Sequence, residues 1–406
     1  MDHSNIIFLR ILRSALCGEH CAELLEISAP DWAEIFRVAE IHSVLPLIYQ
    51  AVYMIPMVKE LPAIRNKVRN LAMLQTVKTD EFLRLYCRLM EQNCKPLVVK
   101  GLICRNLYPT PDLRLSNDED VLISKEQYDT YHQLLKEAGL YTEVEDSQRM
   151  KEYEVPYRKK DGLLYIELHK SLFPPEADAY GDWNRFFAGA EERAIEIDGV
   201  WTLCHTDHLF YLICHAFKHF LHSGFGIRQV CDIVMFANAY GNQVDWQQIY
   251  QNCCEIHAEY FTAALFKIGR KYLIFDPDQA AYPNIWRNIE VDETHMLEDL
   301  LSSGVYGGST MSRKHSSNMT LEAVSADKQG KKAGVSLKNS LFPSAKSLEN
   351  RYPYLKKHPY LLLYAWLNRS VKYGLEQKGK ANNSAVESLK IGSERVELLR
   401  EYKIIK

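Results

Sequence analysis

The pattern of apolar and polar positions divides the chain into a helical start, a mixed middle and a helical remainder. Apolar positions in residues 1–92 recur at helical spacing, and a long amphipathic helix is predicted over 61–92. It opens at Leu61-Pro62, and proline is well tolerated in a first helical turn. Its apolar stripe contains Leu71, Leu74, Val77, Phe82, Leu85 and Leu89. This region carries no chemical motif and is interpreted as a packing module.

In the middle of the chain, short strands alternate with one helix. A buried strand is predicted over 96–99 and a helix over 125–138. Ser124 and Gln127 have the spacing of a capping box at the start of that helix, and Gly139 fits its C-terminal end. Weaker strands are predicted over 140–146 and 152–159.

The clearest strand covers residues 163–169. Leucine and isoleucine occupy one face, and Tyr165, Glu167 and His169 occupy the other. Lys160-Asp161-Gly162 just before it is a strong hairpin signal. This mixture of strands, a helix and hairpins predicts an α+β fold with a mixed sheet.

Beyond residue 200 the periodicity is helical again, with helices predicted over 206–221, 227–239, 246–264, 361–373 and 396–402. Residues 309–338 are rich in Ser, Lys, Gly and Asn, which predicts a flexible loop or linker. The predicted division is an N-terminal helical region at 1–92, a mixed core at 93–200, a helical domain at 201–300, a flexible loop or linker at 301–340 and a C-terminal helical region at 341–406.

Composition places the chain among globular proteins, with 47% hydrophobic and 25% charged residues. The net charge of −3 gives no strong attraction to nucleic acid or to an anionic membrane. No apolar run reaches the roughly 18 residues that span a bilayer, and the N-terminus does not resemble a signal peptide. The ten cysteines are scattered without a C-x-x-C pair, as expected for reduced thiols. We therefore expect a soluble, cytoplasmic protein.

The candidate chemistry is centred on residues 100–123. Asp118 and Asp120 directly precede the apolar run Val121-Leu122-Ile123, at the rim of a buried strand. Residues two apart on a strand point the same way, so the two carboxylates stand side by side and repel unless a cation lies between them. Mg²⁺ is typically held by one or two carboxylates and substrate phosphates. Because a lone D-x-D is common, a solvated turn is the competing interpretation.

Glu167 supplies a third acid on the polar face of another strand. Three carboxylates from two strands can hold two metal ions roughly 4 Å apart, which support an in-line displacement at phosphorus. Gly101 would let phosphates approach the backbone closely, because it has no side chain to block them. These residues predict a metal-dependent enzyme that acts on a nucleoside triphosphate.

Histidines form a second cluster, in which His215 and His219 lie one helical turn apart. That spacing can bind zinc, but the sequence has no H-E-x-x-H motif. Packing and contacts that line a cleft are the favoured interpretation. His169 is the better site candidate because it shares a strand face with Glu167.

The site residues resemble those of the uncharacterised nucleotidyltransferase family in the polymerase-beta-like superfamily. The matching residues are Lys100-Gly101, Tyr108-Pro109, Arg114, Asp118-Glu119-Asp120 and Glu167-Leu168-His169. Weaker resemblance lies at His42 to Tyr49, His215, His219, Arg228, Asp232, and Phe342-Pro343 to Arg369. The resemblance implies a polymerase-beta-like nucleotidyltransferase core flanked by N-terminal and C-terminal helical regions.

By this resemblance, Asp118 and Asp120 bind Mg²⁺, with Mn²⁺ as an alternative, and the triphosphate. Glu167 is the third carboxylate, either a metal ligand or the base that accepts the acceptor's proton. The nucleotide-binding positions are Lys100, Gly101, Arg114 and His169. Lys100 and Arg114 would offset phosphate charge.

The leading hypothesis is a nucleotidyltransferase that moves a nucleoside monophosphate, with ATP favoured as the donor, to an unknown hydroxyl and releases pyrophosphate. A small molecule, sugar or protein is a better acceptor candidate than nucleic acid. The turn Lys100-Gly101-Leu102 and Asn117 depart from the superfamily pattern. They motivate the alternative of a non-catalytic nucleotide-binding or regulatory protein. A metal phosphohydrolase is disfavoured, because no His-Asp pair of the kind used by such enzymes is found.

Overall fold

The computed structural model describes residues 1–21, 27–175, 181–304, 311–328, 330, 345–348, 352–356, 358–368 and 385–406. Within these residues, a contiguous buried core extends from Ile7 to Ile405, and a smaller apolar cluster lies around Leu355. The helix predicted over 361–373 is described only as far as residue 368.

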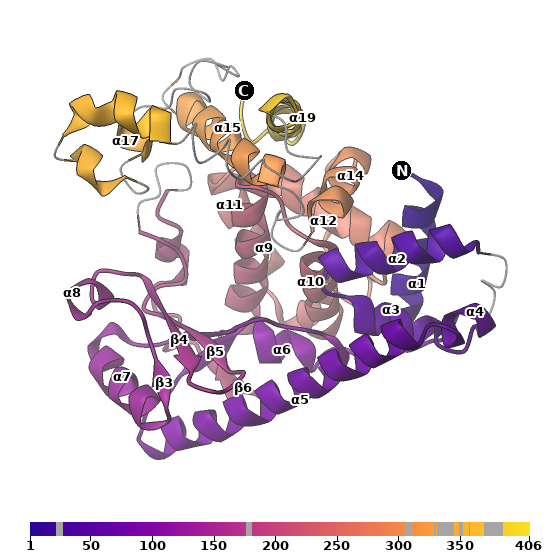
Figure 1. Cartoon of the computed structure of the whole chain (residues 1–406), viewed down its shortest axis with the longest axis horizontal. Helices are drawn as coiled ribbons and strands as arrows, with labels where there is room; N and C mark the ends of the chain where they lie inside the picture. The colour runs from indigo at the N-terminus through magenta and orange to yellow at the C-terminus, as the bar shows by residue number, and fades with distance from the viewer. Residues whose placement is uncertain are drawn as a thin grey trace.

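The N-terminal region is helical, as predicted, and its longest element lies beneath the sheet. Its helices are α1 (His3–Leu16), α2 (Ala29–Ile41), α3 (Leu45–Val52), α4 (Pro56–Lys59) and α5 (Pro62–Glu91). The bounds of α5 confirm the long amphipathic helix, with Pro62 in its first turn. Figure 1 shows α5 as a long rod across the bottom of the view, below α6 (Gly101–Arg105) and the sheet.

The sheet has five strands in the order β1-β2-β5-β4-β3. The strands are β1 (Leu97–Val99), β2 (Glu119–Leu122), β3 (Leu140–Tyr141), β4 (Glu154–Lys159) and β5 (Tyr165–His169). β2 and β5 pair in parallel, and the other neighbours are antiparallel. This mixed sheet with helical flanks confirms the predicted α+β fold class.

Two local predictions around α7 (Tyr128–Glu137) have different outcomes. Gly139 has a φ of 83°, a backbone conformation that glycine adopts at low cost, so its place at the helix C-terminus is confirmed. The predicted capping box at Ser124 is wrong. A 3₁₀ turn over Lys125–Gln127 precedes α7, and the Ser124 hydroxyl bonds to Glu126 instead of capping a backbone N–H.

Two pairs of antiparallel strands are joined by short hairpin turns. Asp161 has a φ of 56° between β4 and β5, which confirms the predicted hairpin. A second hairpin, whose strands were not predicted, pairs β6 (Ile195–Ile197) with β7 (Val200–Thr202) across a turn at Asp198-Gly199. β7 packs against β1 and continues into the helical domain.

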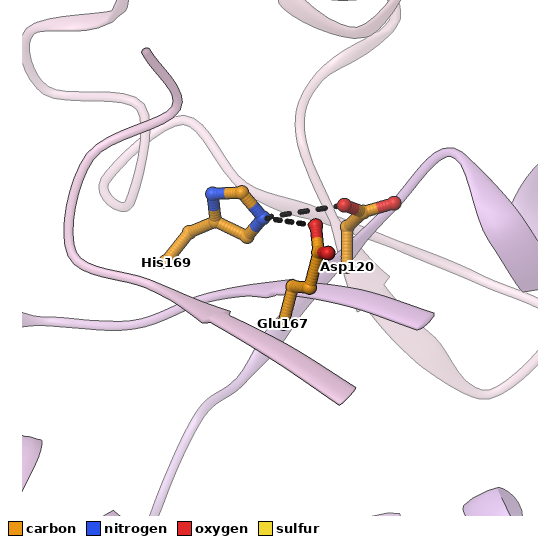
Figure 2. A group of neighbouring side chains, drawn as sticks. All are labelled: Asp120, Glu167 and His169. Carbon is orange, nitrogen blue, oxygen red and sulfur yellow. Dashed lines mark hydrogen bonds and ion pairs between the residues drawn. The ribbon is translucent and has the colours of Figure 1, made fainter. Parts of the chain in front are cut away.

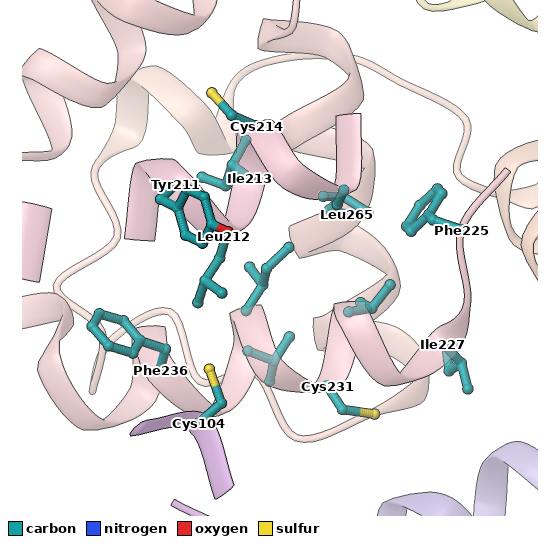
Figure 3. Packing of buried hydrophobic residues seen from close by; sticks show 14 of the residues in the cluster. Cys104, Tyr211, Leu212, Ile213, Cys214, Phe225, Ile227, Cys231, Phe236 and Leu265 are labelled. Atoms are coloured by element: carbon teal, nitrogen blue, oxygen red, sulfur yellow. The ribbon is translucent and has the colours of Figure 1, made fainter. Parts of the chain in front are cut away.

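The next helices are α9 (His205–Leu221), α10 (Ile227–Tyr240), α11 (Trp246–Glu255), α12 (Glu259–Tyr272), α13 (Asn284–Arg287) and α14 (Thr294–Ser303). They pack against one another, and α9 contacts Lys100 and Tyr153 at the sheet. Figure 3 shows apolar residues of α9, α10 and α12 packed together, with Cys104 of α6 beside them. The single helix predicted over 246–264 is wrong, because His257 has a φ of 56° and separates α11 from α12.

The linker predicted over 301–340 is corrected within the described residues, because α15 (Met311–Lys328) is an 18-residue helix that packs against α19 (Ala385–Glu401). Its buried positions include Ser316, Thr320 and Ala323, which are too small or polar to give an apolar stripe in the sequence. Residues 305–310, 329 and 331–340 of the predicted linker lie outside the described residues. α17 (Ala345–Leu348) and 3₁₀ turns at Pro353–Lys356 and Pro359–Leu361 follow.

α19 also fastens the end of α9. Its Arg395 guanidinium pairs with Asp299 at 3.1 Å and donates to the carbonyl oxygens of Phe220 and His222. These carbonyls belong to the last turn of α9, whose C=O groups lack intrahelical partners. Among the described helices, none has both the length and the apolar character needed to cross a membrane.

Candidate active site

An acid–histidine group lies on one face of the sheet, where β2 and β5 run side by side. The register places Asp120 opposite Glu167 and Leu122 opposite His169. Since strand side chains alternate between faces, Asp120, Glu167 and His169 point the same way. His169 Nε2 is 3.2 Å from Asp120 Oδ1 and 3.8 Å from Glu167 Oε2. Figure 2 draws both contacts as dashed lines. The structure thus brings three of the candidate site residues, Asp120, Glu167 and His169, together on one face of the sheet.

Asp118 lies just before β2 and is half-buried. Within the described residues, the group with metal-ligand geometry is Asp120, Glu167 and His169, and their ligand atoms lie within 4.8 Å of one another. Asp118 is outside this group. Its carboxylate still acts on Glu167, whose pKa it helps to raise. The metal-binding role of Asp118 stays a prediction.

The pKa values of the three clustered side chains are shifted in different directions. Burial raises the pKa of Glu167 to about 7, and the charges of Asp120, Asp118 and Glu154 add to this effect. Burial also works against ionisation of Asp120, but Lys100 and His169 outweigh it and hold that pKa well below its usual range. For His169, burial is outweighed by the hydrogen bond and charge of Asp120, so its pKa is raised. The face therefore carries an ionised Asp120 beside a carboxyl that resists ionisation.

Lys100 is held against this group by its backbone and its side chain. Its Nζ lies 2.6 Å from Asp120 Oδ2. Its φ is 63°, a conformation that costs a non-glycine residue free energy and is often found at functional sites. Its backbone N–H donates to His208 Nε2 at 3.1 Å, and His208 Nδ1 lies 3.1 Å from the Thr202 hydroxyl. The fold thus maintains a strained backbone that directs an ammonium at Asp120.

Gly101 is constrained by Glu119, the acid between the two aspartates. A Cβ at Gly101 would lie 2.1 Å from Glu119 Oε2. Glu119 points to the sheet face opposite Asp120, where it accepts from the backbone N–H of Leu102 at 3.1 Å and pairs with Arg105 at 2.5 Å. This carboxylate gives a structural reason for the glycine that the sequence did not reveal.

Arg114 is buried in a different cluster. Its Nε and Nη2 donate to the two oxygens of Asp232 at 3.1 and 2.5 Å, and the Tyr108 hydroxyl donates to Asp232 Oδ1 at 2.9 Å. The Arg114 side chain is 1% exposed. Three residues that carry the family resemblance therefore meet in one place and join the core to α10. Arg228 lies on the same helix as Asp232, and its guanidinium donates to the Leu115 carbonyl.

The histidines of α9 show no zinc geometry. His215 and His219 have ring centroids 4.7 Å apart, but neither belongs to the metal-ligand group found in the described residues. Burial lowers the pKa of His219 to about 3 and that of His215 well below its usual range, so both are neutral near pH 7. His215 Nε2 lies 3.5 Å from Lys100 Nζ, which agrees with the interpretation that these histidines line the site.

The donor set fits a divalent cation. Two carboxylates and an imidazole converge, and the cation now closest to Asp120 is the Lys100 ammonium. Carboxylate oxygens suit Mg²⁺ and Mn²⁺, while imidazole suits transition metals better than Mg²⁺. All ten cysteines are free thiols, as predicted, and none of them joins this group.

A mixed sheet that carries two carboxylates and a histidine on one face, enclosed by helices, defines an α+β protein with a candidate metal-dependent active site. The model of a family described as uncharacterised nucleotidyltransferase matches residues 28–273. Because this match covers more than half of the 406 residues, the chain belongs to that family. The chain has no match among the curated proteins or the solved structures with which it was compared. The resemblance noted at Phe342-Pro343 to Arg369 lies beyond the matched residues.

Proposed function

We propose that the protein is a divalent-metal-dependent nucleotidyltransferase that transfers a nucleoside monophosphate from a nucleoside triphosphate to an acceptor hydroxyl. The observation that carries this proposal is the convergence of Asp120, Glu167 and His169 in a chain of this family. Transfer to a hydroxyl forms a new phosphoester bond at the α-phosphorus, breaks the bond to the β-phosphate and releases pyrophosphate.

The metal would be held by Asp120 and Glu167, with Asp118 and His169 next to them. A bound Mg²⁺ or Mn²⁺ supplies a Lewis acid that stabilises negative charge on the phosphates. Asp118 is proposed to reach the metal and triphosphate from the edge of β2. Glu167 is proposed as the third carboxylate, a ligand or the group that accepts the proton of the acceptor hydroxyl.

The cations have separate proposed roles. Lys100 lies against Asp120 and would contact phosphate from the turn that includes Gly101. Arg114 is balanced by Asp232, so we propose that it positions the core against α10 rather than binding phosphate directly. ATP is the favoured donor. A small molecule, sugar or protein hydroxyl is proposed as acceptor in preference to nucleic acid, because the net charge is −3.

The test measures pyrophosphate release from each nucleoside triphosphate with Mg²⁺ or Mn²⁺. We expect Asp120→Asn and Glu167→Gln each to lower release by at least 100-fold, because preorganised charge stabilisation commonly contributes roughly that much. Asp129→Asn, an exposed acid of α7, serves as the matched control and should retain wild-type release. Wild-type release from the Asp120→Asn/Glu167→Gln double variant would refute the proposal. Triphosphate binding without release under either metal would indicate the non-catalytic alternative.

A further inference from the structure

Lys218 of α9 lies near the candidate active site and has no role in the proposed function. Lys218 is half-buried, and its Nζ lies 3.5 Å from the Tyr153 hydroxyl and 5.7 Å from the centroid of the Tyr153 ring. Tyr153 directly precedes β4, and its ring centroid lies 6.3 Å from that of His169. Lys218 and His169 of the metal-ligand group thus both lie beside Tyr153.

Lys218 has no carboxylate partner at ion-pairing distance within the described parts of the chain. Other lysines near the sheet have a charged or backbone partner, because Lys100 pairs with Asp120 and Lys159 with Glu81, while Lys78 and Lys170 donate to the carbonyl oxygens of Ser116 and Arg149. A partly desolvated ammonium without an anion costs free energy, and a bound anion would offset that cost. Burial lowers the pKa of Lys218, while the charges of Glu154, Glu167 and Asp120 oppose this effect. These carboxylates are therefore close enough to act on Lys218 without pairing with it.

Lys100 and Lys218 both lie beside the polar residues of α9 that face the sheet. Lys100 Nζ contacts His215 Nε2 at 3.5 Å, and the ring of His215 packs against that of His219 on the next turn. Lys218 directly precedes His219 on the same helix, and the charge of Lys100 acts on it. The acidic residues Asp120 and Glu167 lie on the sheet, whereas His215 and His219 of α9 are neutral and Lys218 is cationic.

From this arrangement we propose that Lys218, assisted by the Tyr153 hydroxyl, binds the β- and γ-phosphates of the incoming triphosphate. This inference rests on the proposed function, since the α-phosphate must then lie at Asp120 and Glu167. Lys100 and Lys218 together flank an anion that carries three or four negative charges. A single carboxylate would need only one of these cations, so a polyphosphate tail is the ligand class that uses both. The tail points away from β2 and toward α9 and the start of β4.

The experiment uses the full chain and inorganic triphosphate as the probe, in metal-free buffer, with affinity measured by isothermal titration calorimetry. We expect Lys218→Met to weaken binding by roughly 10- to 100-fold, the effect of losing one charge-assisted hydrogen bond. Lys218→Arg should keep most of the affinity because it retains the charge. Lys95→Met is the matched control, since Lys95 also lies over an aromatic ring, 3.6 Å from the centroid of Trp201, and should bind as the wild type does.

A second variant covers the case in which Lys218→Met does not fold. Tyr153→Phe keeps the ring and removes the hydroxyl, and we expect it to weaken triphosphate binding by a smaller factor than Lys218→Met. In turnover assays, Lys218→Met should raise the KM for the nucleoside triphosphate. Unchanged triphosphate affinity in both variants, or equal weakening by Lys95→Met, would overturn the subsite.

The failure of this subsite and the failure of the proposed function give different results. If the wild type releases no pyrophosphate but binds inorganic triphosphate through Lys218, the subsite stands and nucleotidyl transfer is refuted. If release depends on Asp120 and Glu167 but neither KM nor triphosphate affinity responds to Lys218, transfer stands and the subsite is refuted. Absence of triphosphate binding by the wild type also refutes the subsite.

Discussion

Replacing Arg114 with methionine would leave the Asp232 carboxylate buried without its guanidinium partner. Asp232 is 2% exposed, so water does not reach it readily in the folded chain. Two charge-assisted hydrogen bonds would be lost, at 3.1 and 2.5 Å, each of which contributes about 1.5–3 kcal/mol. Breaking a buried ion pair by removing one partner commonly costs about 3–5 kcal/mol. We therefore expect Arg114→Met to lower the free energy of unfolding by about 3–5 kcal/mol.

The double variant Arg114→Met/Asp232→Leu removes both charges. It distinguishes the cost of leaving one buried charge unpaired from the cost of altered packing. Apolar replacement of a buried ion pair is often close to neutral, and the Tyr108 hydroxyl would lose one acceptor at a cost of about 1–2 kcal/mol. We expect the double variant to be more stable than Arg114→Met alone. The exposed pair Arg84–Asp80, with side chains 78% and 55% exposed, provides the control, and Arg84→Met should cost less than about 1 kcal/mol.

Urea denaturation followed by tryptophan fluorescence measures these differences, and the chain has six tryptophans. The reasoning is refuted if Arg114→Met unfolds within about 1 kcal/mol of the wild type, the range of an exposed pair. If triphosphate affinity falls in that variant while stability is kept, Arg114 contacts phosphate as the sequence analysis predicted.

Three further changes test other parts of the fold. Gly101→Ala places a Cβ 2.1 Å from Glu119 Oε2 and should lower the free energy of unfolding by about 1–3 kcal/mol, whereas an unchanged urea midpoint would show that Glu119 moves aside freely. Burial lowers the pKa of His42 to about 4, so the unfolded chain takes up this proton first and stability falls as the pH drops from about 6.5 to about 4. The contribution at pH 5 is about 2 kcal/mol, and His42→Gln should remove it from the pH dependence of unfolding; an identical pH dependence in the variant contradicts this assignment. Arg395→Met should speed hydrogen exchange of amides in the last turns of α9, and unchanged exchange there would mean that α19 does not hold that end.

Local patterns in the sequence were sufficient to predict much of the sheet. The alternation in Tyr165–His169 predicted which side of β5 is polar, and the turn at Asp161 predicted the hairpin to β4. These features arise from neighbouring residues, so a sequence displays them directly. Glu167 could be expected beside Asp120 if their two short strands were neighbours. The register of β2 and β5 places these two residues opposite each other.

Other features depend on contacts that no local pattern records. Arg114 and Asp232 are 118 positions apart, and nothing in either neighbourhood marks them as partners. The sequence therefore did not predict this pair, and Arg114 was expected, from the family resemblance, to offset phosphate charge. The helix α15 was missed for a related reason, because its buried positions include Ser316 and Thr320, which form no apolar stripe, and Thr320 donates to the distant His222 carbonyl. Lys218 received no role because its environment is set by Tyr153 on a distant segment.

The parallel pairing of β2 and β5 also bears on the order in which the chain folds. The β4–β5 hairpin closes over a short turn, whereas Asp120 and His169 are 49 positions apart and must meet across a long loop. Closing a long loop costs chain entropy before its contacts stabilise the chain, so non-local pairs tend to form late. We expect the acidic residues to stay apart in early intermediates and to approach one another only in the final assembly. A divalent cation that neutralises them would then accelerate the last step of folding rather than the first.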